Sequence, residues 1–137
     1  MRQFVIQLAN RPGELAHLAR ALAARGIDLR HVACLGSGSE ACAFIIPSDE
    51  AAMRQVLRGF GHRYIEGEAV VTRVPDQPGG LAEVAERLAR AGVNILGTIS
   101  IGRGSGYVEM AFTVDDEEKA RRVLGANQEL HAVAGLT

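Results

Sequence analysis

The sequence contains one internal repeat, and this repeat limits the folds open to the chain. Residues 12–28, PGELAHLARALAARGID, align with residues 78–94, PGGLAEVAERLARAGVN, at a constant offset of 66 (78 minus 12). Eight of the aligned residues are identical, which is too many for chance, and self-similarity at a fixed period indicates copies of one structural unit. We therefore expect two small domains, residues 1–67 and 68–137, in place of one larger domain.

Each copy begins with a strand and a helix. Apolar runs at residues 4–8 and 69–74 suit strands, and the Pro-Gly pair that follows each run suits the first turn of a helix. Apolar residues then recur at helical spacing until Gly26 and Gly92 end the two helices. The apolar stripes consist of Leu15, Leu18, Ala19 and Leu22 in the first copy and of Leu81, Val84, Ala85 and Leu88 in the second.

The remainder of each copy predicts a hairpin, a second helix and a last strand. These elements fall at residues 29–35, 41–46, 49–58 and 63–66 in the first copy and at 95–101, 107–114, 115–124 and 130–133 in the second. The order β-α-β-β-α-β, present twice, predicts an α+β protein with two ferredoxin-like domains, each an antiparallel sheet with both helices on one face. Val56 matches Val123 at an offset of 67, so the second copy holds one extra residue.

Glycine-rich segments at residues 36–39 and 102–106 lie inside the two predicted hairpins. The second has the composition of a phosphate-binding loop, but such a loop precedes a helix, whereas this segment precedes a strand. Its counterpart in the first copy has the character of a hairpin turn. We therefore interpret both segments as turns and expect no cofactor.

The charge balance argues against nucleic-acid and membrane partners. Fifteen basic and sixteen acidic residues give a net charge of −1, and Lys and Arg form no cluster. The longest purely apolar run, residues 41–46, is far shorter than the roughly 20 residues that span a bilayer. The apolar amino-terminal run is interrupted by Gln7 and then by Asn10, Arg11 and Pro12, so it lacks the sustained apolar core of a secretory signal, and a cytoplasmic location is expected.

Cysteine and histidine give no sign of a metal site. We interpret Cys34 and Cys42 as small apolar side chains in buried strands, with a disulfide across the hairpin as the alternative. The histidines do not have the spacing of a ligand cluster, and two cysteines do not complete a zinc site. The four histidines are His17, His31, His62 and His131.

Two polar loops, one per copy, are the candidate ligand-binding segments. They comprise Asn10, Arg11, Pro12 and Gly13 in the first copy and Asp76, Gln77, Pro78, Gly79 and Gly80 in the second. A glycine at a helix start leaves backbone N–H groups open to a ligand carboxylate, which the helix dipole also favours. Side-chain oxygen atoms at positions 10, 76, 28 and 94 are candidates to bind a ligand ammonium group.

A simpler interpretation of the same polar residues remains open. Asn10 and Asp76 are residue types that cap helices in proteins of every kind. Asp28 and Asn94 follow helices and are equally suited to turns.

The two loops, together with the Gly-Ile-Asp or Gly-Val-Asn that closes each first helix, resemble the ACT family in both halves of the chain. The resemblance implies that ACT domains pair along their edge strands into an eight-stranded sheet and bind a small ligand, usually an amino acid, between them. It implies that loop 10–13 faces Asn94, Leu96 and Thr98, and that loop 76–80 faces Asp28 and His31. Two departures are that no enzyme domain accompanies the repeats and that Glu14 stands where the second copy has Gly80. Because glycine has no side chain, we expect Gly80 to leave the second loop more open than Glu14 leaves the first.

These observations predict a non-catalytic regulatory protein that binds an amino acid at the interface of two ACT domains and relays occupancy to a partner. The partner would be an enzyme or a transcription regulator, and the chain is expected to form a homo-oligomer. One alternative is a dissociable regulatory subunit of an amino-acid biosynthetic enzyme, and another is a ligand-free interaction module that uses its edge strands. An acylphosphatase-like hydrolase using Arg11 is disfavoured because the second copy has Gln77 there.

Overall fold

The computed structural model describes residues 1–125, and the chain divides into two compact units, Met1–Gly67 and Glu68–Thr137. The strand expected at residues 130–133 lies outside the described residues. In the part of the chain that is described, no helix has the length and apolar character needed to cross a membrane.

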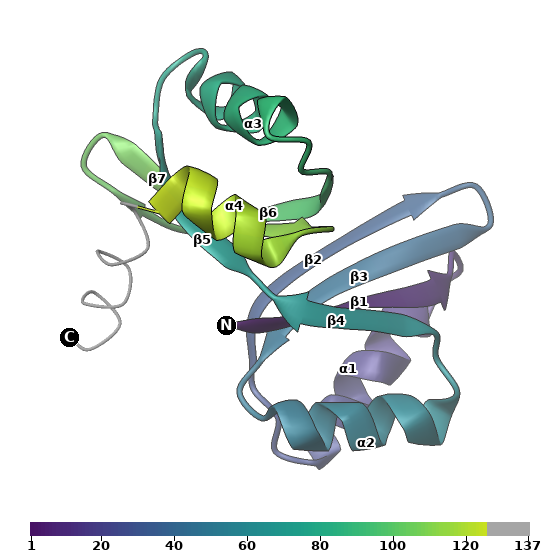
Figure 1. Ribbon diagram of the computed structural model, residues 1–137. Coiled ribbons are helices and arrows are strands. Elements are labelled where there is room, and N and C mark those ends of the chain that lie inside the picture. Colours follow the sequence, from purple (N-terminus) through teal and green to yellow (C-terminus); the bar gives the residue numbers. More distant parts are fainter. Residues whose placement is uncertain (126–137) are drawn as a thin grey trace. The chain divides into compact units, whose positions relative to one another are not determined.

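The first unit has the complete β-α-β-β-α-β order (Figure 1). Its elements are β1 (Arg2–Ala9), α1 (Glu14–Ala24), β2 (Leu29–Ser37), β3 (Glu40–Pro47), α2 (Glu50–Phe60) and β4 (Tyr64–Glu68). The strands form one sheet in the order β2-β3-β1-β4. Alternate residues of β1, namely Phe4, Ile6 and Leu8, pack with Leu22 of α1 and Leu57 of α2, so both helices cover the same face of the sheet.

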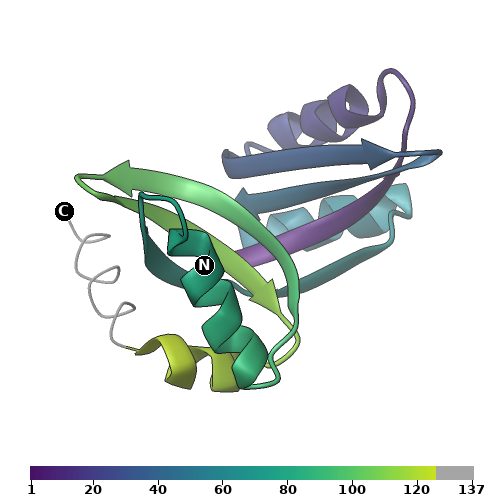
Figure 2. The ribbon, with the colours of Figure 1, turned by 90° about the horizontal axis from the view of Figure 1, so that it is seen from above.

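The second unit repeats this plan over its described residues. Its elements are β5 (Val70–Pro75), α3 (Gly80–Arg90), β6 (Ile95–Gly104), β7 (Tyr107–Val114) and α4 (Glu117–Leu124), with strand order β5-β7-β6. Val70 and Phe112 from the sheet pack with Leu88 of α3 and Leu124 of α4. Figure 2 shows α3 in front of the long hairpin formed by β6 and β7.

The α+β class and the ferredoxin-like plan are therefore confirmed. The described strands form two antiparallel sheets, one of four strands and one of three. Their union into a single eight-stranded sheet stays a prediction.

A β-bulge accounts for the extra residue in the second copy. Both β2 and β6 carry a register shift near their start, but β6 has a second shift between Ser100 and Gly102. The residue between them, Ile101, is the insertion that changes the repeat offset from 66 to 67. A bulge of this kind places two residues of one strand opposite one residue of its neighbour and alters which way the following side chains point.

The two cysteines occupy opposite faces of the β2–β3 hairpin. Cys34 pairs with Ala43, whereas Cys42 pairs with Leu35, the residue next to Cys34. Because neighbouring residues of a strand point to opposite faces, the thiols point apart and cannot form a disulfide across this hairpin. Both cysteines are free and exposed, so the expectation of buried thiols was wrong.

Candidate functional site

The helices that follow the two polar loops begin in the same way. Gly13 and Gly79 are the N-cap residues of α1 and α3, with left-handed backbone angles of φ 90° and 89° and no side-chain cap. This conformation favours glycine because it has no Cβ. A Cβ built on either glycine would meet no atom within 4 Å, so both caps face open space. The alternative that Asn10 or Asp76 caps a helix was therefore wrong.

In the first unit, Asn10 fastens its loop to the β2–β3 hairpin. Its side-chain Nδ2 donates a 2.9 Å hydrogen bond to the Gly38 carbonyl, and its backbone N–H donates to the carbonyl of Ser39 at 2.9 Å. The amide also lies directly against Gly36, since a Cβ at that position would be 2.7 Å from Asn10 Oδ1. The space between this loop and its hairpin is thus filled by Asn10.

In the second unit, the corresponding residue is Asp76, and it makes an ion pair instead. Arg103 of β6 donates from a guanidinium nitrogen to Asp76 Oδ2 at 2.8 Å, and both side chains are well exposed. Arg103 holds the position of Gly36, because each is the second-last residue of its strand and pairs with the second residue of the next strand. The loop here is held to its hairpin by opposite charges across a more open space.

The sheet register places Arg103 on the helix-covered face. Val74, Val108 and Arg103 form one row across β5, β7 and β6, and Met110 with Ser100 belongs to the next row on that face. Val74 belongs to the core that the sheet forms with α3, so the row that contains Val74 and Arg103 lies on the helix-covered face of the sheet. Ser100 and Arg103 are three residues apart and would alternate to opposite faces without the bulge at Ile101.

A hollow of about 480 Å³ lies between the first turn of α3, the loop before it and the β6–β7 hairpin. It is lined by Val74, Pro75, Asp76, Gln77, Pro78, Leu81, Ser100, Arg103, Val108 and Met110. Three predicted site residues, Asp76, Gln77 and Pro78, are among these. The sequence reasoning missed the hairpin residues, although aligning Arg103 with Gly36 across the repeat would have indicated that this position differs between the copies.

Gly80 has a packing role that differs from the one expected. We expected this glycine to leave the second loop more open than Glu14 leaves the first. Gly80 is buried, however, and a Cβ there would be 2.1 Å from the carbonyl oxygen of Pro75. Glycine is required because α3 approaches the end of β5 closely, whereas the corresponding Glu14 makes an ion pair with Arg11.

The predicted residues beyond the loops do not line this hollow. The backbone N–H groups of Asp28 and Asn94 donate to the side chains of Ser48 and Asp115, each at 2.9 Å, which fixes the turn after each first helix. His31 pairs with Ile46 in the first sheet. Leu96 and Thr98 are exposed residues of β6. Whether these five residues contact a ligand stays a prediction.

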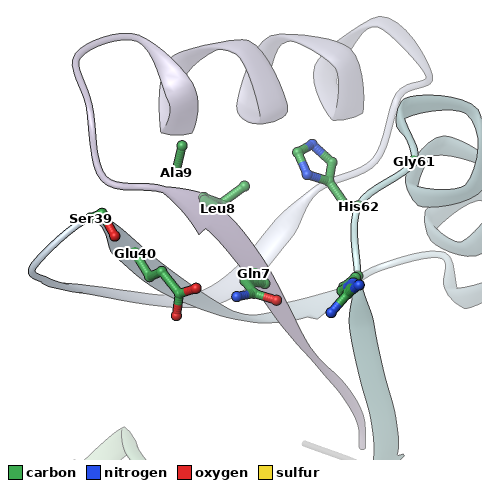
Figure 3. Close-up of a pocket in the computed structure, with 8 residues that line it drawn as sticks. Gln7, Leu8, Ala9, Ser39, Glu40, Gly61 and His62 are labelled. Atoms are coloured by element: carbon green, nitrogen blue, oxygen red, sulfur yellow. The ribbon is translucent and has the colours of Figure 1, made fainter.

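The first unit has a different hollow, of about 380 Å³, near the end of β1 (Figure 3). It is lined by Gln7, Leu8, Ala9, Ser39, Glu40, Gly61, His62 and Arg63, and none of these is a predicted site residue. Leu8, Ala9 and His62 point toward the helix drawn above the strand, and Gln7 and Glu40 point away from it. The lining therefore does not converge on one side of the strand.

The strongest electrostatic feature of the first unit lies on its last strand. Glu66 accepts hydrogen bonds from Arg54 at 2.8 Å and from Arg2 at 2.8 Å. The bond from Arg54, supported by the bond from Arg2, lowers the pKa of Glu66 from 4.5 to about 2, although partial burial opposes the shift. We assign this cluster to the stability of the sheet, because it ties the first and last strands to α2.

Comparison with known protein families finds a match in the second half of the chain. Residues 69–135 match the family model of the ACT domain. No curated protein matches the sequence significantly.

Solved structures share the fold over most of the chain. A protein from Bacteroides thetaiotaomicron has 23% identity and a TM-score of 0.73, with 91% of this chain and 86% of that chain covered. The regulatory subunit of aspartate kinase from Thermus thermophilus has 17% identity and a TM-score of 0.63, covering 91% of each chain. The same subunit from Thermus flavus has 22% identity and a TM-score of 0.63, covering 91% and 90%. At these sequence identities, the similarity between this chain and the solved structures is a similarity of fold alone.

Proposed function

We propose that this chain is a non-catalytic regulatory protein that binds an amino acid in the hollow of its second unit. On binding, the chain relays occupancy to a partner protein. The ACT domain at residues 69–135 and the fold shared with regulatory subunits support a regulatory role. The first unit, which has the same β-α-β-β-α-β order, is proposed to be a second ACT domain.

The observation that carries this proposal is the ion pair between Asp76 and Arg103 at the edge of the hollow. An amino acid carries a carboxylate and an ammonium group, so it matches a site that offers one cation and one anion. Arg103 can take the carboxylate and Asp76 the ammonium group. A volume of about 480 Å³ is in the usual range for small-molecule sites.

Opening the ion pair for a ligand costs little. Its side chains are 65% and 44% exposed, and exposed ion pairs stabilise a fold by only about 0–1 kcal/mol. The adjacent start of α3 has no side-chain cap, and helix N-termini favour anions, so the carboxylate gains a second source of stabilisation. The ion pair therefore opposes the entry of a zwitterion only weakly.

Ligand binding can change partner binding only if the ligand and the partner each prefer one conformation of the protein. The two preferences can be for the same conformation or for different conformations. The resulting coupling is reciprocal, so the partner also changes ligand affinity. The sequence-based prediction that loop 76–80 faces residues of the other half would provide such a coupling, and it stays a prediction.

The direct test is calorimetric titration of the full chain with each of the twenty amino acids. We expect one of them to bind, and Arg103→Ala to weaken that binding by about 10- to 100-fold, because a hydrogen bond to a charged group is lost. Arg20→Ala removes an exposed arginine from α1 of the first unit and should leave affinity unchanged. Absence of binding by every amino acid, in chain shown to be folded, would reject the proposal.

A second candidate is a dissociable regulatory subunit of an amino-acid biosynthetic enzyme. The fold likeness to aspartate kinase regulatory subunits over about nine-tenths of the chain favours it. Affinity purification from native cells should then recover a stoichiometric catalytic subunit. Recovery of a transcription regulator instead would favour a different partner for the same ligand-binding function.

A further inference from the structure

The lining of the hollow is divided into a charged end and an apolar wall. Asp76 and Arg103 lie together at one end, where the loop meets the hairpin. The wall is formed by six apolar residues, Val74, Pro75, Pro78, Leu81, Val108 and Met110. Gln77 and Ser100 are the neutral polar members of the lining. One end is therefore suited to the main-chain groups of an amino acid, and the wall to its side chain.

Leu81 gives the wall an exposed apolar surface. It lies in the first turn of α3, and 47% of its surface is exposed although it borders the hollow. Met110 and Val108 contribute from β7 on the same face of the sheet. Covering such surface removes apolar area from water, at about 25 cal/mol per Å², so a ligand with an apolar side chain gains affinity here.

A charged ligand side chain finds no partner on this wall. Within the described lining, the two charged residues are the pair assigned to the ligand's main-chain groups. A third charge on the ligand would lie beside Leu81, Val108 and Met110, where no opposite charge in the described lining compensates for the water that it loses. The site therefore selects on side-chain polarity.

We infer that the hollow is specific for amino acids with an uncharged apolar side chain, with Leu81, Val108 and Met110 as the specificity-determining residues. This inference rests on the proposed function. The inference extends the proposed function because all amino acids share the main-chain carboxylate and ammonium groups, which therefore cannot determine specificity. The apolar wall contacts the side chain, in which amino acids differ.

The test compares leucine, isoleucine, valine and methionine with aspartate, glutamate, lysine and arginine by calorimetry. The parent protein should bind at least one of the first group ten-fold or more tightly than any of the second. Leu81→Lys should weaken apolar-ligand binding by at least ten-fold, because it places an ammonium group against the ligand side chain. Leu15→Lys is the matched control, since Leu15 holds the same place in α1 and is 40% exposed. It should leave affinity unchanged.

The outcomes separate this inference from the function on which it rests. Tighter binding of a charged amino acid would overturn the inference and leave the proposed function standing. Unchanged affinity of folded Leu81→Lys protein for an apolar ligand would also overturn it, because the wall would not contact the side chain. Failure of all twenty amino acids to bind would instead reject the proposed function.

Discussion

Arg103 in the second unit stands where Gly36 stands in the first, and each determines what the loop opposite it does. Gly36 leaves room for the Asn10 amide to lie against the hairpin, whereas Arg103 holds Asp76 by a 2.8 Å ion pair. The two repeats therefore share a fold, but their first loops make different contacts. We expect one ligand per chain, bound in the second unit.

The contact between Asn10 and Gly36 can be measured as a coupling energy. Gly36→Ala should destabilise the protein by about 1 kcal/mol, because the new methyl group displaces the amide and breaks its bond to Gly38. In an Asn10→Ala background the same substitution should cost nothing. Urea denaturation of the four proteins gives the double-mutant cycle, and additive effects would show that the two residues are independent.

Gly80 should be the least replaceable glycine of the second loop. Gly80→Ala places a Cβ 2.1 Å from a backbone oxygen, which cannot move aside as a side chain does, so we expect a loss of about 2–4 kcal/mol. Glu14→Ala, at the corresponding position of α1, should cost less than about 1 kcal/mol because it removes an ion pair whose arginine, Arg11, is 71% exposed. Equal losses in thermal or urea unfolding would contradict this packing role.

Glu66 predicts a defined acid sensitivity of the first unit. Its folded-state pKa of about 2 lies below the ordinary value of 4.5, so its stabilisation is present above pH 4.5 and is lost as the pH falls toward 2. Glu66→Gln should lower stability by about 1 kcal/mol near neutral pH, and the difference from the parent should shrink below pH 4.5. Glu50→Gln, which loses only a 3.8 Å pair with Arg54, is the control. A pH-independent difference would contradict the assignment.

The sequence was sufficient to predict the architecture because the repeat, the apolar periodicity and the glycine stops agree in each half. Strand and helix positions followed from these local patterns, as for α1 (Glu14–Ala24) and α3 (Gly80–Arg90). The role of Gly13 and Gly79 as helix starts was also predictable, since proline and glycine at a loop–helix junction limit the backbone.

The site was less predictable because its decisive contact depends on tertiary structure. Asp76 and Arg103 are 27 residues apart and meet only because β5 and β6 both pair with β7. Simple alternation from Ser100 would have put Arg103 on the opposite face, and the bulge at Ile101 reverses that expectation. The requirement for Gly80 likewise comes from a close approach to Pro75, which no local pattern reveals.

The most direct test of ligand binding in the second unit compares Gly79→Asp with Gly13→Asp. Both glycines are N-caps with φ near 90° and open space around them, so aspartate should strain the two helix starts to a similar degree. Gly79 follows Pro78 of the lining, so Gly79→Asp adds a negative charge to the loop of the proposed site and Gly13→Asp does not; this charge is expected to repel the ligand carboxylate. A ligand at about a hundred times its dissociation constant stabilises the folded state by about 2.7 kcal/mol, which corresponds to several degrees in melting temperature.

Calorimetry with the amino acid that binds the parent gives the stoichiometry and affinity of both variants. These two values test whether the loop before α3 is part of the ligand site. One ligand per chain in the parent and in Gly13→Asp, with binding lost in Gly79→Asp, is the expected result. Unchanged stoichiometry and affinity in folded Gly79→Asp protein would contradict it, because the loop before α3 would then be a helix start and not part of a ligand site.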